Sequence, residues 1–203
     1  MYKSSRKNLE RDYISCLACN LVFVPSPFHL GREQEKERYL QHKNDINDPD
    51  YRGFLSRLSE QVIPYLAQGC SGLDYGAGPG PALAAMLEEK GYEMKIYDPH
   101  FHQDASVLET VYDFIVCTET AEHFSSPARD FSLLNSVLAP GGLLGVMTSV
   151  LYKQINFQNW YYRLDPTHLS FYTPETMKWI GKRWDWLVTS PVENVYLFRK
   201  PNI

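Results

Sequence analysis

The stretch GLDYGAGPG at residues 72–80 holds the first residues whose types and spacing could do chemistry. After Gly72, its closely spaced glycines are Gly76, Gly78 and Gly80. A glycine-rich turn between a strand and a helix lets a ligand approach the backbone closely and directs free N–H groups towards it. The dinucleotide fingerprint requires G-x-G-x-x-G, but Pro81 stands where its third glycine would fall. A phosphate-binding loop is excluded as well, because no Lys-Ser/Thr pair follows.

Two acidic residues accompany this loop. Asp74 lies two positions before Gly76, where a carboxylate would repel a pyrophosphate but accept a hydrogen bond from an ammonium group. Asp98 ends the following apolar run, KIYDP, where an acid can bind both hydroxyls of a ribose. The ligand should therefore carry a ribose, an ammonium and a carboxylate and no pyrophosphate, which fits S-adenosylmethionine.

A second group of reactive side chains lies in TETAEH, residues 118–123. Glu119 and His123 are four positions apart, so one turn of helix would place them on the same face, with Glu122 beside them. His123 is a candidate catalytic base, because the unperturbed pKa of histidine lies near neutrality. The alternative is a plain helix start.

A third group lies in WYYRLDPTHLSFYT, residues 160–173. His168 is a candidate to take a proton from a hydroxyl or amine nucleophile, and Arg163 could pair with an anionic group of a substrate. Trp160, Asp165 and Tyr172 complete the candidate substrate residues. The alternative is that the rings belong to the core and that His168 is structural.

Cys16 and Cys19 form a C-x-x-C pair near the N-terminus. A structural zinc site needs four ligands, and the other cysteines, Cys70 and Cys117, lie in the strand region. The pair therefore indicates either zinc with further ligands or a β-hairpin that has no metal.

These residues need a scaffold in which strands and helices alternate after residue 71. The apolar runs SGLDYG, EMKIYD, YDFIVCTE and LLGVMTSV predict parallel strands, and the stretches between them predict helices, one of them closed by Pro140 and Gly141. DWLVTS and ENVYLFRK predict a closing antiparallel pair. The fold class is therefore α/β with a doubly wound, mostly parallel sheet. The usual third strand has little room between Asp98 and Tyr112. We expect a small N-terminal appendage over residues 1–60, containing the charged helix REQEKERYLQHK, and one main domain over residues 61–203.

The ordered stretches GLDYGAGPG, KIYDP, YDFIVCTETAEHF and LAPGGLLGVMT resemble the successive motifs of class I S-adenosylmethionine-dependent methyltransferases. This resemblance implies a seven-stranded Rossmann-like sheet and transfer of a methyl group to a small-molecule acceptor. It implies that Asp98 holds the ribose and that Pro99, Thr118 and Glu119 border the adenine and the sulfonium. The residues expected around the methionine part of the cofactor are Asp74, Gly76, Ala77, Gly78, Pro79 and Gly80.

Finer resemblances concern the other motifs. The E-x-x-E-H segment is similar to that of the ubiquinone-biosynthesis O-methyltransferases, some of which hold a divalent metal with the residues corresponding to Glu119, Glu122 and His123. RDYISCLACNLVFV resembles the second half of a zinc ribbon. Tyr39, His42 and Asn44 fall where related enzymes place a segment over the cofactor.

The net charge and the length of the apolar runs limit which binding partners we expect. A net charge of -4 over 203 residues produces no broad basic field, which argues against nucleic acid. No apolar run is long enough to span a bilayer and no secretory signal is visible, so we expect a cytoplasmic protein. Two other functions stay open: a nicotinamide-dependent oxidoreductase, and a non-catalytic methyltransferase-fold module that binds a partner through residues 1–60. The acceptor could be a quinol, a phenol, a sugar nucleotide or a small acid.

Overall fold

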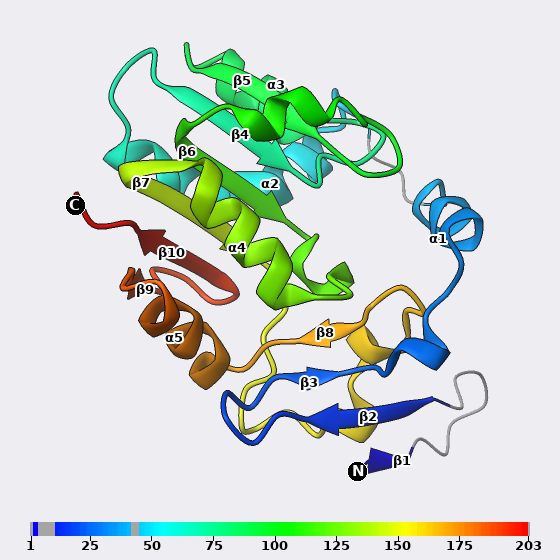
Figure 1. Cartoon of the computed structure of the whole chain (residues 1–203). Coiled ribbons are helices and arrows are strands. Elements are labelled where there is room, and N and C mark those ends of the chain that lie inside the picture. Colours follow the sequence, from blue (N-terminus) through cyan, green and yellow to red (C-terminus); the bar gives the residue numbers. More distant parts are fainter. Residues whose placement is uncertain (1, 4–10, 42–44, 203) are drawn as a thin grey trace.

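The computed structural model describes residues 2–3, 11–41 and 45–202, and within them the main sheet has six strands in the order β5-β4-β6-β7-β10-β9 (Figure 1). The strands from β5 to β7 run parallel, and β10 is antiparallel to both of its neighbours. This arrangement confirms the predicted α/β class and the closing antiparallel pair. The bounds are β4 Ser71–Tyr75, β5 Glu93–Tyr97, β6 Tyr112–Thr118, β7 Leu138–Met147, β9 Leu187–Thr189 and β10 Val195–Arg199.

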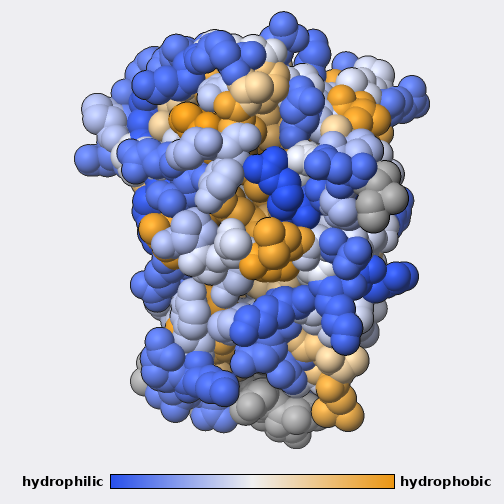
Figure 2. Space-filling view, turned by 90° about the vertical axis from the view of Figure 1, so that its left-hand side faces the viewer, coloured by the Kyte–Doolittle hydropathy of each residue, from blue (hydrophilic) through white to orange (hydrophobic). Residues whose placement is uncertain are grey.

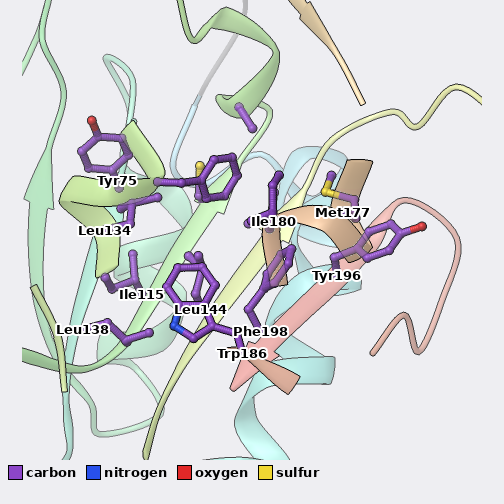
Figure 3. Packing of buried hydrophobic residues seen from close by; sticks show 14 of the residues in the cluster. Tyr75, Ile115, Leu134, Leu138, Leu144, Met177, Ile180, Trp186, Tyr196 and Phe198 are labelled. Atoms are coloured by element: carbon purple, nitrogen blue, oxygen red, sulfur yellow. The ribbon is translucent and has the colours of Figure 1, made fainter. Parts of the chain in front are cut away.

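Helices cover both faces of this sheet because its strands alternate apolar side chains between two cores. In β10, Val195 and Leu197 lie in the core formed with α2 (Pro49–Val62) and α3 (Ala82–Glu88). Tyr196 and Phe198 lie in the opposite core, which α4 (Pro127–Val137) and α5 (Pro174–Arg183) cover. Figure 3 shows part of this second core, with Ile180 near Phe198 and Leu134 near Tyr75.

A second, smaller sheet lies beside the main one and has the order β1-β2-β3-β8 (Figure 1). Its strands are β1 (Tyr2–Lys3), β2 (Asp12–Ser15), β3 (Val22–Phe23) and β8 (Ser170–Phe171). A third apolar core lies under it, containing Tyr13, Phe157, Trp160 and Phe171 among others. The N-terminal hairpin therefore packs on a segment from the far end of the sequence.

This pairing changes the predicted domain organisation. The expected boundary at residue 60 falls inside α2, and α2 packs on the main sheet, where the side chains of Val62 and Leu58 approach Gly145 of β7. The N-terminal segment completes its sheet only with β8. Residues 1–60 are thus not a separate unit in the described structure.

Two further expectations about the sheet differ from the structure. The prediction of seven strands is wrong for the described residues, because the short stretch between β5 and β6 forms the 3-10 helix η3 (Ala105–Glu109) instead of a strand. Pro140 and Gly141 do not close α4, which ends at Val137. They lie in β7, whose pairing with β6 is irregular at this point.

The charged helix forms as α1 (Arg32–Tyr39) and buries none of its residues (Figure 1). Glu33 and Glu35 lie in its first turn and Lys36 and Arg38 in its last, which suits the helix dipole, whereas Arg32 and Glu37 lie at the opposite ends. The remaining short helices are η1 (Ser26–Phe28), η2 (Ile63–Tyr65), η4 (Ala121–His123), η5 (Phe157–Asn159) and η6 (Tyr161–Leu164).

The surface in Figure 2 is largely hydrophilic, with hydrophobic residues interspersed. Among the described helices, none combines the length and apolar character that crossing a membrane requires.

Candidate active site

A cavity of about 1230 Å³ opens where β4, β5 and β6 end. Its wall consists of the turns after these three strands, the inner side of α1, and part of the segment that contains η6. The carboxyl ends of parallel strands are where open α/β sheets bind ligands. The cavity therefore brings together all three groups of candidate residues.

The glycine loop has a backbone shape that other residues would not adopt easily. Gly76 has φ +84°, and a Cβ there would lie 2.1 Å from Cγ2 of Thr120. Gly78 also has positive φ, at +64°. The N–H groups of Gly76 and Ala77 donate to the carbonyl of Tyr97, at 2.8 and 3.2 Å. The end of β5 thus holds the loop open towards the cavity.

Asp98 connects this loop to the next turn. Its carboxylate accepts hydrogen bonds from the backbone N–H groups of Gly78, His100 and Phe101, at 3.0, 2.7 and 3.0 Å. It also lines the cavity, together with Pro99. Each carboxylate oxygen has more than one lone pair, so Asp98 can accept further bonds from a ligand.

Asp74 and Gly80 occupy different positions from those expected. Asp74 does not line the cavity: its side chain is buried behind the loop, where the backbone N–H of Ala84 donates to it. Burial raises the pKa of Asp74 to about 7. Gly80 also lies outside the cavity wall, and its carbonyl accepts a bond from the N–H of Ala82. The expectation of direct contact with the cofactor is therefore corrected for both residues, while Gly76, Ala77, Gly78 and Pro79 line the cavity.

The turn after β6 is strained. Glu119 has φ +46°, a value that residues other than glycine rarely adopt. The hydroxyl of Thr120 donates to the carbonyls of Gly76 and Thr118, so this turn and the glycine loop support each other. Burial, reinforced by the charge of Glu122, raises the pKa of Glu119 well above its usual range.

Two polar atoms of the cavity wall are buried without a hydrogen-bond partner among the described residues: Oγ1 of Thr118 and Nδ1 of His100. Buried polar groups in folded proteins are normally paired. Thr118 ends β6 and His100 follows Asp98, so both lie beside the expected position of the nucleoside. Their free atoms fit a wall that is completed by a ligand.

Helix α1 bridges the two ends of the cavity. At one end Arg32 donates to the carbonyl of Pro99 at 2.7 Å, and Glu35 pairs with His100 at 3.5 Å. At the other end Arg38 pairs with Asp165 at 2.7 Å. The ring of Tyr39 lies edge-on between those of His100 and His123, 5.2 and 5.0 Å away. Tyr39 thus lines the cavity between these two histidines.

Asp165 lines the cavity, but its carboxylate is already used. Burial opposes its ionisation, yet the bonds from Arg38 and from the hydroxyl and N–H of Thr167 lower the pKa of Asp165 well below its usual range. In the described structure Asp165 therefore holds α1 and its own turn in place.

Glu122 and the two candidate histidines meet at the end of the cavity opposite the nucleoside side. Glu122 is only 1% exposed, and its carboxylate accepts bonds from the hydroxyls of Tyr162 and, at 2.7 Å, Thr148. The rings of His123 and His168 are 4.9 Å apart. One ligand atom from each of these three residues lies within 4.8 Å of the others.

Both histidines have a defined tautomer. Nδ1 of His123 is 3.0 Å from the carbonyl of Thr167, and Nδ1 of His168 is 2.6 Å from that of Tyr162. A carbonyl only accepts hydrogen bonds, so each Nδ1 carries the hydrogen and each Nε2 presents a lone pair. Burial lowers the pKa of His168 to about 4, which keeps this imidazole neutral.

This trio tests the metal site that the resemblance implied. Glu122 and His123 belong to a group that could hold a cation, but Glu119 does not, and His168 takes the third place. The implied set of Glu119, Glu122 and His123 is therefore not assembled. Among the described residues no other such group was found.

Three predicted substrate residues lie outside the cavity wall. Arg163 is 2% exposed and donates to the carbonyl of Gln158, with its guanidinium over the rings of Tyr13 and Phe157. Trp160 is in the third core, and the hydroxyl of Tyr172 donates to the carbonyl of Ala121. Because these side chains are buried against protein, the prediction that they contact substrate is corrected to a structural role.

The C-x-x-C pair lies at the turn of the β2–β3 hairpin. All four cysteines are free thiols. No third His, Cys or carboxylate from the described ranges joins Cys16 and Cys19. His42 and Asn44 lie outside the described residues.

Sequence reasoning missed several residues that shape the site, chiefly Tyr162, Thr148 and Arg38. Tyr162 stood in the quoted aromatic stretch, and its spacing of six from His168 offered a weak signal. Thr148 and Arg38 carried no local signal, because their partners are distant in sequence.

The comparisons with known proteins agree with this architecture. A family model described as "Methyltransferase domain" matches residues 41–190, well over half of the chain. No curated protein sequence matches.

Solved structures show the same fold at low sequence identity. The 1,6-didemethyltoxoflavin-N1-methyltransferase of Burkholderia thailandensis, with bound 1,6-didemethyltoxoflavin and S-adenosylhomocysteine, has a TM-score of 0.59 at 14% identity, covering 94% of this chain and 99% of its own. Phosphoethanolamine N-methyltransferase 2 of Haemonchus contortus, in complex with S-adenosyl-L-methionine, has a TM-score of 0.57 at 16% identity, covering 78% of this chain and 43% of its own. An O-methyltransferase family protein of Burkholderia thailandensis has a TM-score of 0.52 at 12% identity, covering 82% of this chain and 63% of its own. The similarity in fold, the cavity at the carboxyl ends of the strands and the family match over residues 41–190 lead to one conclusion: the chain belongs to the methyltransferase-domain family.

Proposed function

We propose that the protein transfers a methyl group from S-adenosylmethionine to the oxygen or nitrogen of a small molecule. The observation that carries this proposal is the single cavity wall formed by the glycine loop, Asp98 and the turn after β6. Two solved structures of the same fold carry S-adenosylmethionine or S-adenosylhomocysteine.

The cofactor end of the cavity has a group for each part of this ligand. The loop from Gly76 to Pro79 would surround the methionine part, and Asp98 would accept from the ribose hydroxyls. Pro99, Thr118 and Glu119 would border the adenine and the sulfonium. Asp74, behind the loop, would act on the ammonium through the loop and not by contact.

The acceptor end would then be the part of the cavity beside Glu122, His123 and His168. A sulfonium is already activated, so the protein mainly has to orient the nucleophile in line with the methyl group and exclude water. We place the nucleophilic atom of the acceptor against the Nε2 atoms of the two histidines. Helix α1 would close the cavity over both ligands through Tyr39 and the Arg38–Asp165 pair.

The resemblance to the ubiquinone-biosynthesis branch depends on residues 119–123 alone. The cytoplasm stays the predicted location. The family match does not favour a nicotinamide-dependent oxidoreductase, and the wide cavity with unpaired polar atoms argues against a non-catalytic module.

Calorimetric titration with S-adenosylhomocysteine tests the proposal. The wild-type chain should bind it, and Gly76→Ala should abolish binding because the new Cβ would collide with Thr120 at a positive φ. Gly53→Ala is the matched control: that glycine lies in α2, and a Cβ added there would have nothing within 4 Å, so binding should persist. Absence of binding to the wild-type chain overturns the proposal.

A further inference from the structure

We infer that Glu122, His123 and His168 bind one divalent transition-metal cation at the acceptor end of the cavity. One ligand atom from each residue lies within 4.8 Å of the others, and all three residues line the cavity. Two imidazoles and one carboxylate form a ligand set known for zinc and for non-haem iron.

The hydrogen bonds of the two histidines are those of metal ligands. A histidine that binds a metal normally donates its other ring N–H to a carbonyl or carboxylate, which fixes its tautomer and orientation. His123 does so to Thr167 and His168 to Tyr162. In both rings Nε2 is therefore the nitrogen that is available to a cation.

Glu122 is oriented in the same manner. Tyr162 donates to one carboxylate oxygen and Thr148 to the other, which leaves lone pairs on both. A carboxylate that is almost fully buried is costly unless opposite charge or several donors compensate it. A cation at this position would supply that charge.

The scaffold holds the three ligands in place from two distant segments. Glu122 and His123 belong to η4, and His168 precedes β8. The N–H of Leu169 donates to the carbonyl of Glu122 at 2.7 Å, and the hydroxyl of Ser170 donates to the carbonyl of Phe124 at 2.8 Å. Two bonds to backbone carbonyls, made by the residues directly after His168, thus connect the two segments that carry the ligands.

The ligand types select the kind of cation. Magnesium and calcium prefer oxygen ligands, whereas imidazole suits zinc, iron, cobalt and nickel. Three protein ligands leave at least one coordination position for an atom from the cavity. That a methyl acceptor occupies this position rests on the proposed function, whereas cation binding itself does not. The histidines would then contact the acceptor through the cation and not act as proton acceptors.

The site differs from the set that the sequence resemblance implied, and this difference makes it testable. Glu119 is outside the group and His168 is inside it. The variants His123→Asn and His168→Asn remove Nε2 but keep a side-chain N–H that can donate to the backbone carbonyl. Glu119→Gln and His100→Asn are controls from the same cavity, and Cys16→Ser is a control for the C-x-x-C pair.

The experiment is a titration of the full chain with Co²⁺, followed by visible absorption, with S-adenosylhomocysteine binding measured on the same samples. We expect one bound Co²⁺ without the near-ultraviolet bands of thiolate ligands. Loss of a second-shell partner already weakens metal binding about 10–100-fold, so each ligand variant should lose at least about 100-fold in Co²⁺ affinity, and the three controls should retain it.

Two results would overturn the inference. One is the absence of Co²⁺ binding by a wild-type chain that binds S-adenosylhomocysteine, in which case the proposed function still stands. The other is binding that survives in His168→Asn but is lost in Glu119→Gln or Cys16→Ser. Conversely, Co²⁺ binding that depends on both histidines, in a chain that does not bind S-adenosylhomocysteine, supports the cation site and removes the proposed function.

Discussion

The two ends of the cavity are built by different means. At the cofactor end, backbone groups of the glycine loop form part of the wall, and the loop is held by Tyr97, Asp98 and Thr120. At the acceptor end, side chains form the wall, and they come from two segments, η4 and the residues before β8, that meet through bonds such as that of His123 to Thr167. The glycine spacing and the strand ends of the first site can be predicted from local sequence, whereas the side chains of the second site meet only after the chain has folded.

This difference predicts the largest effect at Asp98. Asp98→Ala should weaken S-adenosylhomocysteine binding by about 100-fold, because three backbone N–H groups and the ribose lose their acceptor and hydrogen bonds to charged groups contribute about 1.5–3 kcal/mol each. Calorimetry measures this change. Asp74→Asn is the comparison, since its side chain lies behind the loop, and its effect should stay within about threefold. Equal losses of S-adenosylhomocysteine affinity in both variants would show that a side chain behind the loop affects binding as strongly as a side chain in contact with the ligand.

At the acceptor end the corresponding effect should appear in stability. Tyr162→Phe should lower the free energy of unfolding by about 2 kcal/mol, because Glu122 and the N–H of Ser149 lose a buried partner. Urea unfolding measures it, and Tyr161→Phe is the control because that ring is 71% exposed. If Tyr162→Phe weakens S-adenosylhomocysteine binding by as much free energy as it removes from stability, the acceptor end and the cofactor end of the cavity are energetically coupled.

A smaller effect is expected for the contact that joins α1 to the acceptor end. A double-mutant cycle on Arg38→Gln and Asp165→Asn should give a coupling of about 1 kcal/mol, because the pair is only partly exposed. The exposed pair of Arg52 and Glu89 should give less. A larger coupling in the surface pair would contradict the view that α1 is held by its contact with the cavity wall.

The same pair predicts the direction of a pH effect. The pKa of Asp165 is lower in the folded chain than in an unfolded one, so the unfolded state binds more protons as the pH falls. The stabilisation is present at neutral pH and is lost as the pH falls below about 4, the ordinary pKa of aspartate. Unfolding of the wild-type chain should thus depend on acid more steeply than that of Asp165→Asn, and parallel profiles would count against the assignment.

Local pattern was enough for part of the cofactor end. The spacing of Gly76 and Gly78 excluded a dinucleotide site, and the structure shows positive φ at both. The position of Asp98 at the end of an apolar run predicted its place beside the loop. Such predictions succeed because strand ends and glycine turns depend on residues that are neighbours in the sequence.

Local pattern misled where burial decides the role of a side chain. Arg163 and Tyr172 stand in a stretch of reactive residues, yet both are buried and bonded to backbone carbonyls. The N-terminal hairpin likewise gave no sign that β8 would complete its sheet. Whether a polar residue of such a stretch faces a cavity or the core depends on the packing of elements far apart in the chain.

By itself the sequence determined the alternation of strands and helices, the glycine spacing of the loop and the place of Asp98 at a strand end, because each follows from residues within one turn or one strand. Only the tertiary structure decided that His168 and not Glu119 joins Glu122 and His123. The reason is geometric: the strained turn after β6 leaves Glu119 outside that group, while the bonds of Leu169 and Ser170 bring the distant segment against η4.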